Sequence, residues 1–187
     1  MATALEGQHV SLWPYVRGYW PRDTLYALWR LVEEERAYGL IFHGHPQRDN
    51  GCPYPTRGDL AQFVAYFHDD RMTRPLFMVQ SVPDHVLVGL VWFDDVVPGH
   101  RALANVMVRR KYWGPPALEG SFLACRYGFD TLGYQQIWAF TPWPLAVRHA
   151  IQLGFREVAV LPDFCLVDET NHSLIVLRCL PEELHHA

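Results

Sequence analysis

Hydrophobic residues recur at helical spacing in four parts of the chain. In the clearest pattern, apolar residues follow one another in steps of four, three, four and three: Leu118, Phe122, Cys125, Phe129 and Leu132. This spacing places them on one face of a helix that begins near Ala117 and ends at Gly133. Similar patterns predict three shorter helices over residues 23–37, 56–67 and 144–153.

Runs of β-branched and aromatic residues predict the strands between these helices, at residues 9–16, 76–82, 85–93, 102–108, 136–140, 155–161 and 173–180. Connections are expected at residues 43–55, 94–101 and 163–172. An internal glycine, Gly89, indicates a bulge or a close backbone approach in its strand. The strands occur both in clusters and in alternation with helices, which predicts a mixed α/β sheet.

The composition indicates one folded domain. The chain has 187 residues, of which 50% are hydrophobic and 14% aromatic, which suffices for one substantial core. Residues 1–10 lack the basic and apolar regions of a signal peptide, and no run of about 18 apolar residues occurs. We therefore expect a cytoplasmic protein without a membrane span. No C-x-x-C spacing occurs, so free buried thiols are expected for the four cysteines: Cys52, Cys125, Cys165 and Cys179.

The charge pattern disfavours two classes of function. The formal net charge is −4 and no long Lys/Arg run occurs, which makes a nucleic-acid partner unlikely. The weaker alternative is a local basic strip of four residues: Arg101, Arg109, Arg110 and Lys111. The histidine-containing segments at 43–45 and 68–70 lack a second cluster at ligand spacing, so no metal site is expected.

A glycine turn before the long helix is the first candidate for ligand chemistry. It reads Trp113-Gly114-Pro115-Pro116-Ala117. Backbone N–H groups at such a helix start can face an anion such as a phosphate. Pro115 and Pro116 have no N–H, so the turn has fewer donors than its position allows.

Two segments carry a resemblance to a known family. Pro142 to Phe155, with Pro144, Arg148 and Leu153-Gly154-Phe155, is similar to an Asn-Pro-…-Arg-…-Leu-Gly-Phe helix in which Trp143 replaces the Asn. The glycine turn resembles a Trp-Gly-x-Gly-x-Ala pattern. The chain thus resembles the GNAT superfamily of acyl-CoA-dependent N-acyltransferases. The resemblance implies a single α/β (α+β) domain over residues 1–187, with a mixed, mostly antiparallel central sheet flanked by helices.

The resemblance also implies a cofactor and its place. Acetyl-CoA, or another acyl-CoA, would lie between two central strands that separate, expected here at residues 86–93 and 102–108. The pantetheine would bond to backbone of the second strand, and the pyrophosphate would sit on the glycine turn. The expected cofactor-binding residues are Val106, Met107, Val108, Arg109, Lys111, Trp113, Gly114, Ala117 and Trp143. The substrate would be an amine of a small molecule or a protein, and a homodimer is an expected assembly.

The family's chemistry requires a base, because a protonated amine has no lone pair with which to attack. The candidate catalytic residues are Asp94, Asp95 and His100, which lie in the connection after a central strand. The alternative interpretation of this connection is a solvated turn. Many members also carry a tyrosine acid on the short helix, where this chain has Ala150.

The departures from the family pattern support a second hypothesis. Where the family has Arg/Gln-x-x-Gly-x-Gly/Ala, this chain has Lys111 to Pro116, with two prolines in the turn. The paired prolines, the missing tyrosine and Trp143 suggest a catalytically inactive module of the same fold that has lost its CoA site. Trp113, Trp138 and Trp143 either wall a ligand pocket or pack in the core.

Overall fold

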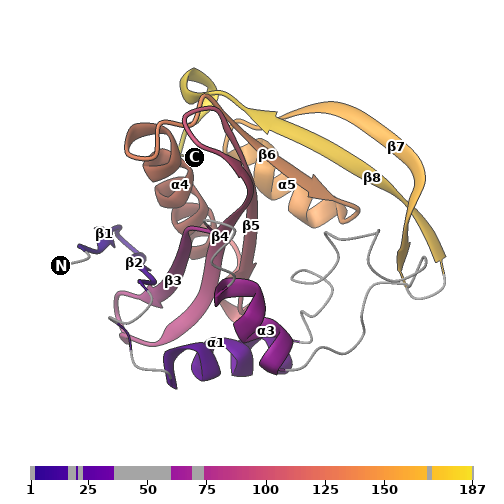
Figure 1. Cartoon of the computed structure of the whole chain (residues 1–187). Coiled ribbons are helices and arrows are strands. Elements are labelled where there is room, and N and C mark those ends of the chain that lie inside the picture. The colour runs from indigo at the N-terminus through magenta and orange to yellow at the C-terminus, as the bar shows by residue number, and fades with distance from the viewer. Residues whose placement is uncertain are drawn as a thin grey trace.

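One twisted sheet runs through the residues that the structure describes, and helices lie against both of its faces (Figure 1). A computed structural model describes residues 3–16, 20, 23–35, 60–68, 74–167 and 170–186. Within them the strand order is β1-β2-β3-β4-β5-β6-β8-β7. The strands are β1 (Leu5–Glu6), β2 (Val10–Pro14), β3 (Leu76–Ser81), β4 (Leu87–Val97), β5 (Arg101–Val108), β6 (Gln136–Thr141), β7 (Arg156–Val167) and β8 (Thr170–Cys179). The helices are α1 (Asp23–Glu34), α3 (Leu60–His68), α4 (Pro115–Asp130) and α5 (Pro144–Gln152).

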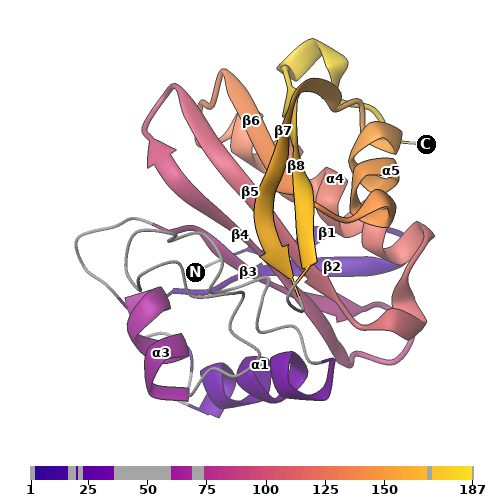
Figure 2. The same ribbon diagram turned by 90° about the vertical axis from the view of Figure 1, so that its right-hand side faces the viewer.

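Neighbouring strands are antiparallel except β5 and β6, which confirms the mixed, mostly antiparallel sheet. Two apolar clusters fill the two sides. One lies between the sheet and the helices α4 and α5, and the other lies under α1 and α3 (Figures 1 and 2). Because both faces of β3 and β4 are covered, their sequences are nearly continuous apolar runs. No helix among the described residues has the length and apolarity needed to cross a membrane.

Helix α4 begins two residues earlier than its apolar spacing predicts. Gly114 precedes it with φ of 92°, a conformation that favours glycine, and Pro115 and Pro116 form its first turn. Gly133 follows its end with φ of 71°. The prolines therefore fix the start of the helix, and they do so at the place expected to hold a phosphate.

Strands β5 and β6 separate after a short stretch of pairing. Their register contains three residue pairs: Arg101–Gln136, Ala102–Ile137 and Leu103–Trp138. The prediction that the strands at residues 86–93 and 102–108 separate is wrong. These strands are β4 and β5, and they stay paired from Gly89–Val108 to Asp94–Leu103. A parallel neighbour lies far away in sequence, and the local pattern did not reveal it.

The last two strands form a longer hairpin than the sequence predicts. The connection expected at residues 163–172 is instead strand up to Val167 and again from Thr170. The register shifts between Leu161 and Cys165, and Asp163 has φ of 51° within that irregular stretch. A bulge therefore stands where the sequence pattern indicated a loop. Gly89 lies beside a similar shift in β4, and a side chain there would meet the Met107 carbonyl.

Several expectations concern residues that the structure does not describe. The loop at 43–55, the segment at 68–70 in part, and Cys52 lie outside the described residues. Cys125, Cys165 and Cys179 are free and buried. Burial raises the pKa of the Cys125 thiol and holds that of Cys179 at about 12, so these thiols are protonated groups of the core.

A buried carboxylate joins the N-terminal segment to α4. Glu119 is 6% exposed. It accepts hydrogen bonds from the backbone N–H groups of Gln8, His9 and Val10 at 2.6, 2.6 and 2.8 Å. At Gly7 a Cβ would lie 2.5 Å from the Glu119 carboxyl carbon, so a glycine is required there. Burial raises the pKa of this carboxyl, but the three donors outweigh burial and keep its pKa below the ordinary value.

Glu119→Gln should therefore lower the free energy of unfolding by roughly 2–3 kcal/mol at pH 7, because an anionic acceptor of backbone donors is lost. A lowered pKa stabilises the fold above the ordinary value of 4.5, and this contribution is lost as the pH falls through the folded-state pKa. Urea unfolding at several pH values measures both effects. The wild-type and variant curves should converge below pH 4.5, and Asp130→Asn on the exposed end of α4 should change little. A pH-independent difference would contradict the account.

Candidate active site

One hydrogen bond shows which backbone groups of β5 face the gap between β5 and β6. The N–H of Arg109 donates to the Val88 carbonyl of β4 at 2.8 Å. The Val108 carbonyl belongs to the same trans peptide group, so it points away from β4 and toward the gap. Because strand residues alternate, Val106 also turns its peptide groups to the gap, whereas Met107 turns its groups to β4. The prediction that Met107 binds the cofactor is therefore corrected: its backbone groups bond to β4 inside the sheet, and its side chain is buried under α1 and α3.

The indole of Trp113 occupies one of these backbone groups. Its Nε1 donates to the Val108 carbonyl at 2.9 Å. The Trp113 side chain is 51% exposed, and the Arg110 guanidinium carbon lies 5.6 Å from the ring centroid. In this conformation a ligand amide cannot reach the Val108 carbonyl unless the indole moves. The peptide groups of Val106 have no strand opposite them on the gap side.

Two backbone donors remain at the glycine turn. Within the described part of the chain, the N–H groups of Gly114 and Ala117 have no acceptor, whereas the Leu118 N–H begins the helix by bonding to the Gly114 carbonyl at 2.9 Å. A Cβ at Gly114 would have nothing within 4 Å, so the turn borders open space. At the start of α4, Gly114 and Ala117 can therefore each offer an N–H group to an anion, whereas Pro115 and Pro116 have none to offer.

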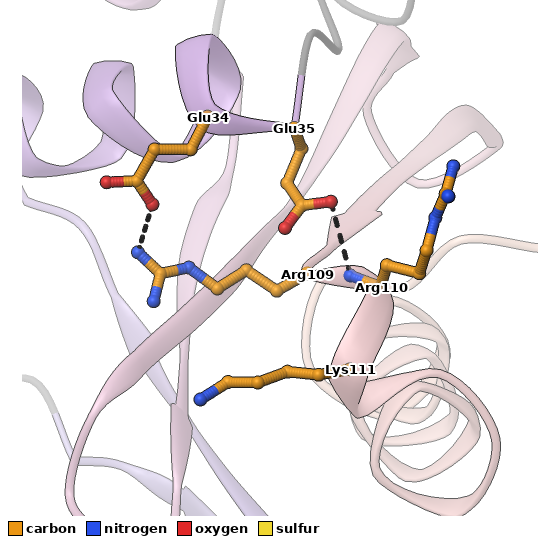
Figure 3. Close-up of a pocket in the computed structure, with 5 residues that line it drawn as sticks. All are labelled: Glu34, Glu35, Arg109, Arg110 and Lys111. Carbon is orange, nitrogen blue, oxygen red and sulfur yellow. Dashed lines mark hydrogen bonds and ion pairs between the residues drawn. The ribbon is translucent and has the colours of Figure 1, made fainter.

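A pocket of about 660 Å³ lies beside this turn, lined by Glu34, Glu35, Arg109, Arg110 and Lys111. Figure 3 shows both glutamates above the basic segment that follows β5; Glu34 is the last residue of α1, and Glu35 follows it. Arg109 Nη2 lies 2.5 Å from Glu34 Oε2, and the Arg110 backbone N–H donates to Glu35 Oε2 at 3.3 Å. Lys111 Nζ lies 4.7 Å from the centroid of Tyr112 and forms no ion pair among the described residues. Of the two expected phosphate-binding cations, Lys111 is thus available, and Arg109 is already neutralised.

Asp94 lies in a hydrogen-bonded network on the opposite face of the sheet. Its carboxylate accepts from Arg74 Nε at 2.6 Å, Trp92 Nε1 at 2.9 Å, Asn105 Nδ2 at 3.1 Å and the Tyr66 hydroxyl. The side chains of Arg74 and Asp94 are 5% and 17% exposed. Burial, with the Asp94 charge, raises the pKa of Tyr66, so its hydroxyl stays protonated and donates. A carboxylate with its acceptor positions filled in this way is a structural anchor rather than a ready base.

The other two candidate bases lie elsewhere. Asp95 is 67% exposed on its side chain, pairs with Arg101 at 3.2 Å and has φ of 45°. His100 is in the turn between β4 and β5, where Nδ1 lies 3.4 Å from Gln135 Oε1. The structure does not bring Asp94, Asp95 and His100 together. It also places Arg101 at the opposite end of β5 from Arg109, about 25 Å away by strand rise, so these arginines do not form one basic strip.

The short helix α5 departs from the family pattern as the sequence indicated. Trp143 precedes it, 37% exposed, with its N–H on Thr141 Oγ1 at 3.1 Å and its ring 6.0 Å from the His172 ring. Trp143 therefore contacts β8, and no described contact joins it to the glycine turn. Ala150 is buried in the core beside α4 and supplies no acid.

The neighbouring residue, His149, joins the two helices that flank this side. Its Nε2 lies 2.9 Å from Ser121 Oγ, and that hydroxyl donates to the Ala117 carbonyl at 2.9 Å. Burial lowers the pKa of His149, so its neutral form is favoured. With the Ser121 proton directed to Ala117, Nε2 must be the protonated nitrogen of the ring. The contact fixes α5 against the first turns of α4.

Sequence reasoning missed three groups of residues here. Tyr66 and Arg74 form the Asp94 network, Glu34 pairs with Arg109, and Glu119 holds the N-terminal segment. Each joins segments that are distant in sequence, so no local spacing indicated them. The signal available was weak: Glu119 is an acidic residue on the buried, mostly apolar side of α4.

Comparison with known proteins identifies the fold. The sequence matches no family model and no curated protein sequence. A structure of a probable GNAT-family acetyltransferase from Chromobacterium violaceum is 21% identical, with a TM-score of 0.70 over 96% of this chain and 87% of that one. Spermidine N-acetyltransferase from Vibrio cholerae, in complex with CoA and spermine, is 17% identical, with a TM-score of 0.70 over 95% of this chain and 98% of that one. A GCN5-related N-acetyltransferase from Brucella melitensis is 19% identical, with a TM-score of 0.66 over 98% and 80%. The chain therefore has the GNAT fold.

Asp94→Asn tests whether this residue is an anchor. The change removes the charge opposite the buried Arg74 and should lower the free energy of unfolding by roughly 3 kcal/mol. Asp95→Asn, at an exposed pair, should cost less than about 1 kcal/mol. Thermal and urea unfolding of both variants provide the comparison. Wild-type stability in Asp94→Asn, together with loss of acyl transfer, would identify a base instead.

Proposed function

We propose that this chain is an acyl-CoA-dependent N-acyltransferase that moves an acetyl group from acetyl-CoA to a primary amine of a small molecule or protein. The observation that carries the proposal is the parallel pair β5–β6, which separates after three residue pairs beside a glycine turn with two unoccupied amides. The GNAT-fold structures that resemble this chain support it, since one of them was crystallised with CoA.

The residues present fit a CoA-type cofactor. Val106 offers peptide groups along the gap, and the N–H groups of Gly114 and Ala117 have no acceptor among the described residues. Lys111 adds a positive charge that no described carboxylate neutralises. Bound acetyl-CoA supplies an activated acyl thioester. The chain's own part is to hold the phosphates at the turn and to align the arm along β5, which places the reacting group where the strands separate.

The amine must reach this place without its extra proton. Asp94 of β4 is paired with Leu103 of β5. Leu103 is in turn paired with Trp138 of β6, and this is the last β5–β6 pair before the gap. Its network holds the Asn105 side chain on the same face. Of the three candidate catalytic residues, Asp94 alone keeps a place in the proposal, as a positioning residue, and the amine's proton passes to water. Asp95 belongs to an exposed ion pair with Arg101. His100 is in the turn before β5, at the end of that strand that is far from Gly114.

One observation favours the inactive module instead. The Trp113 indole already bonds to the Val108 carbonyl, and Pro115 and Pro116 remove two amides from the turn. A chain that fills its own groove in this way would keep the fold without the cofactor. The two functions differ in one measurable respect, the affinity for CoA.

Acetyl-CoA should bind the protein and raise its unfolding temperature. A ligand that binds only the folded state stabilises it by about 2.7 kcal/mol at a concentration of one hundred times Kd. Calorimetric titration with acetyl-CoA and thermal unfolding with increasing CoA measure the same affinity independently. Absence of heat and of any shift at millimolar ligand would favour the inactive module.

Pro116→Gly should strengthen CoA binding by roughly ten- to a hundredfold, because it restores an N–H that can bond to a charged phosphate. The loss of the ring should also lower stability slightly, through the greater freedom of the unfolded chain. Pro181→Gly, at the first residue of the short helix Pro181–Glu183, is the matched control and should leave the affinity unchanged. Equal CoA affinities in the wild type and Pro116→Gly would show that the turn does not hold the phosphates.

A further inference from the structure

Two directly opposed residues of β6 and β8 carry buried donors that find no acceptor in the described part of the chain. These donors are the indole Nε1 of Trp138 and the guanidinium Nε of Arg178. The register pairs Trp138 with Arg178 across the two strands. Buried polar groups normally have partners, so two orphaned donors on one pair indicate a missing acceptor.

Strand alternation places both side chains on the face away from α4 and α5. Ile137 and Leu177, their neighbours, are buried in the core beside those helices, so Trp138 and Arg178 point to the other face. Asn105 and Asp94 lie on this same face, one and two strands from β6 along the sheet. The four residues thus share the surface next to the end of the β5–β6 pairing.

The distance from this pair to the gap suits a small substrate. Trp138 is opposite Leu103 in the last β5–β6 pair, and Arg178 is one strand further. Adjacent strands are about 4.8 Å apart, so Arg178 lies about 10 Å from β5 along the sheet. A molecule bound to Arg178 and Trp138 can therefore extend an amine to the place where β5 and β6 separate.

The chemistry of the missing group follows from the donors. Arginine and the indole N–H donate and do not accept, and an arginine fork matches a carboxylate. Within the described part of the chain the Arg178 side chain has no ion pair. Asp94, three strands away on the same face, pairs with Arg74, and Glu183 pairs with Arg156 at 2.8 Å. Among the described residues of this face, the charge left without an ion pair is therefore that of Arg178.

We propose that Arg178 and Trp138 bind the carboxylate of an amine substrate, so that the acceptor is an amino acid or a similar amino carboxylate. The inference rests on the proposed acyltransferase function and names its substrate class. Phe140 lies on the same face, 41% exposed, with its ring centroid 6.4 Å from that of Trp138, and gives the acceptor an apolar contact. A polyamine such as the spermine bound to the Vibrio cholerae enzyme would bring cations to Arg178, and the like charges would repel each other at this site.

The reaction then balances without further reagents. The acceptor nitrogen forms a C–N bond to the acyl carbon, and the C–S bond of the thioester breaks. The thiol leaves with one proton, and the substrate carboxylate remains unchanged on Arg178. The ammonium proton that was lost before attack passes to water.

A binding experiment tests the site without requiring turnover. N-acetyl-leucine carries the carboxylate and an apolar side chain, and N-acetyl-leucinamide has the same shape without the charge. The acid should bind the wild type at least tenfold more tightly than the amide. Arg178→Gln should remove this difference and should leave the binding of acetyl-CoA unchanged. Arg156→Gln is the matched control, because Arg156 is opposite Arg178 in β7 but pairs with Glu183 and is 71% exposed on its side chain.

A second readout follows the indole itself. In an amide NMR spectrum the Trp138 Nε1–H resonance, assigned with Trp138→Phe, should move downfield on addition of the acid and not of the amide. Two results would overturn the inference: equal binding of the acid and the amide to the wild type, or an Arg178→Gln variant that unfolds at a lower temperature but keeps the preference for the acid. The hydrogen-bond acceptor of Arg178 and Trp138 would then belong to the chain itself. If the protein does not bind acetyl-CoA but still prefers the acid to the amide, the proposed acyltransferase function is wrong and the carboxylate site remains.

Discussion

The separation of β5 from β6 is the constraint on which the other features of the site depend. A sheet that opens leaves peptide groups without partners along both inner edges, and such groups are costly unless something else bonds to them. On β5 the Val108 carbonyl is satisfied by the Trp113 indole, whereas the groups of Val106 have no strand partner on that side. The opening is maintained because α4 and α5 bury the strands below it in one continuous core. Packing elsewhere thus stabilises an edge of β5 whose peptide groups are available to a ligand.

The start of α4 combines two demands that conflict. A rigid helix start favours proline in the first turn, since its N–H is not needed there and its φ already suits a helix. An anion site favours residues that have an N–H at the same positions. Pro115 and Pro116 satisfy the first demand, and Gly114 and Ala117 retain part of the second. The cations of the preceding segment shift the balance only in part, because Glu34 neutralises Arg109.

The sequence predicted the features that arise from short-range periodicity. The apolar steps of α4 located that helix to within two residues at its start, and the succession of helices and strands along the chain was correct from β2 to β8. Pairing between distant strands was not predictable: the parallel register of β5 with β6 was missed, and with it the position of the gap. The residues of the glycine turn are adjacent in sequence, so their proximity was predictable. Asp94 was named as a candidate, but its partner Arg74 belongs to another segment, and the buried network around Asp94 was therefore not predicted.

Charge is distributed unevenly over the face that the acceptor would use. Toward β4 the negative charge of Asp94 is balanced by Arg74 in a buried network, so it presents little field to a ligand. Toward β8 the positive charge of Arg178 has no described counterpart, and the adjacent Trp138 indole adds a donor of the same polarity. A substrate with both an amine and a carboxylate would place its anion at Arg178 and leave its nitrogen toward the neutral end. The orientation of the substrate then follows from electrostatics alone, and a base held on the chain is not needed to select which end reacts.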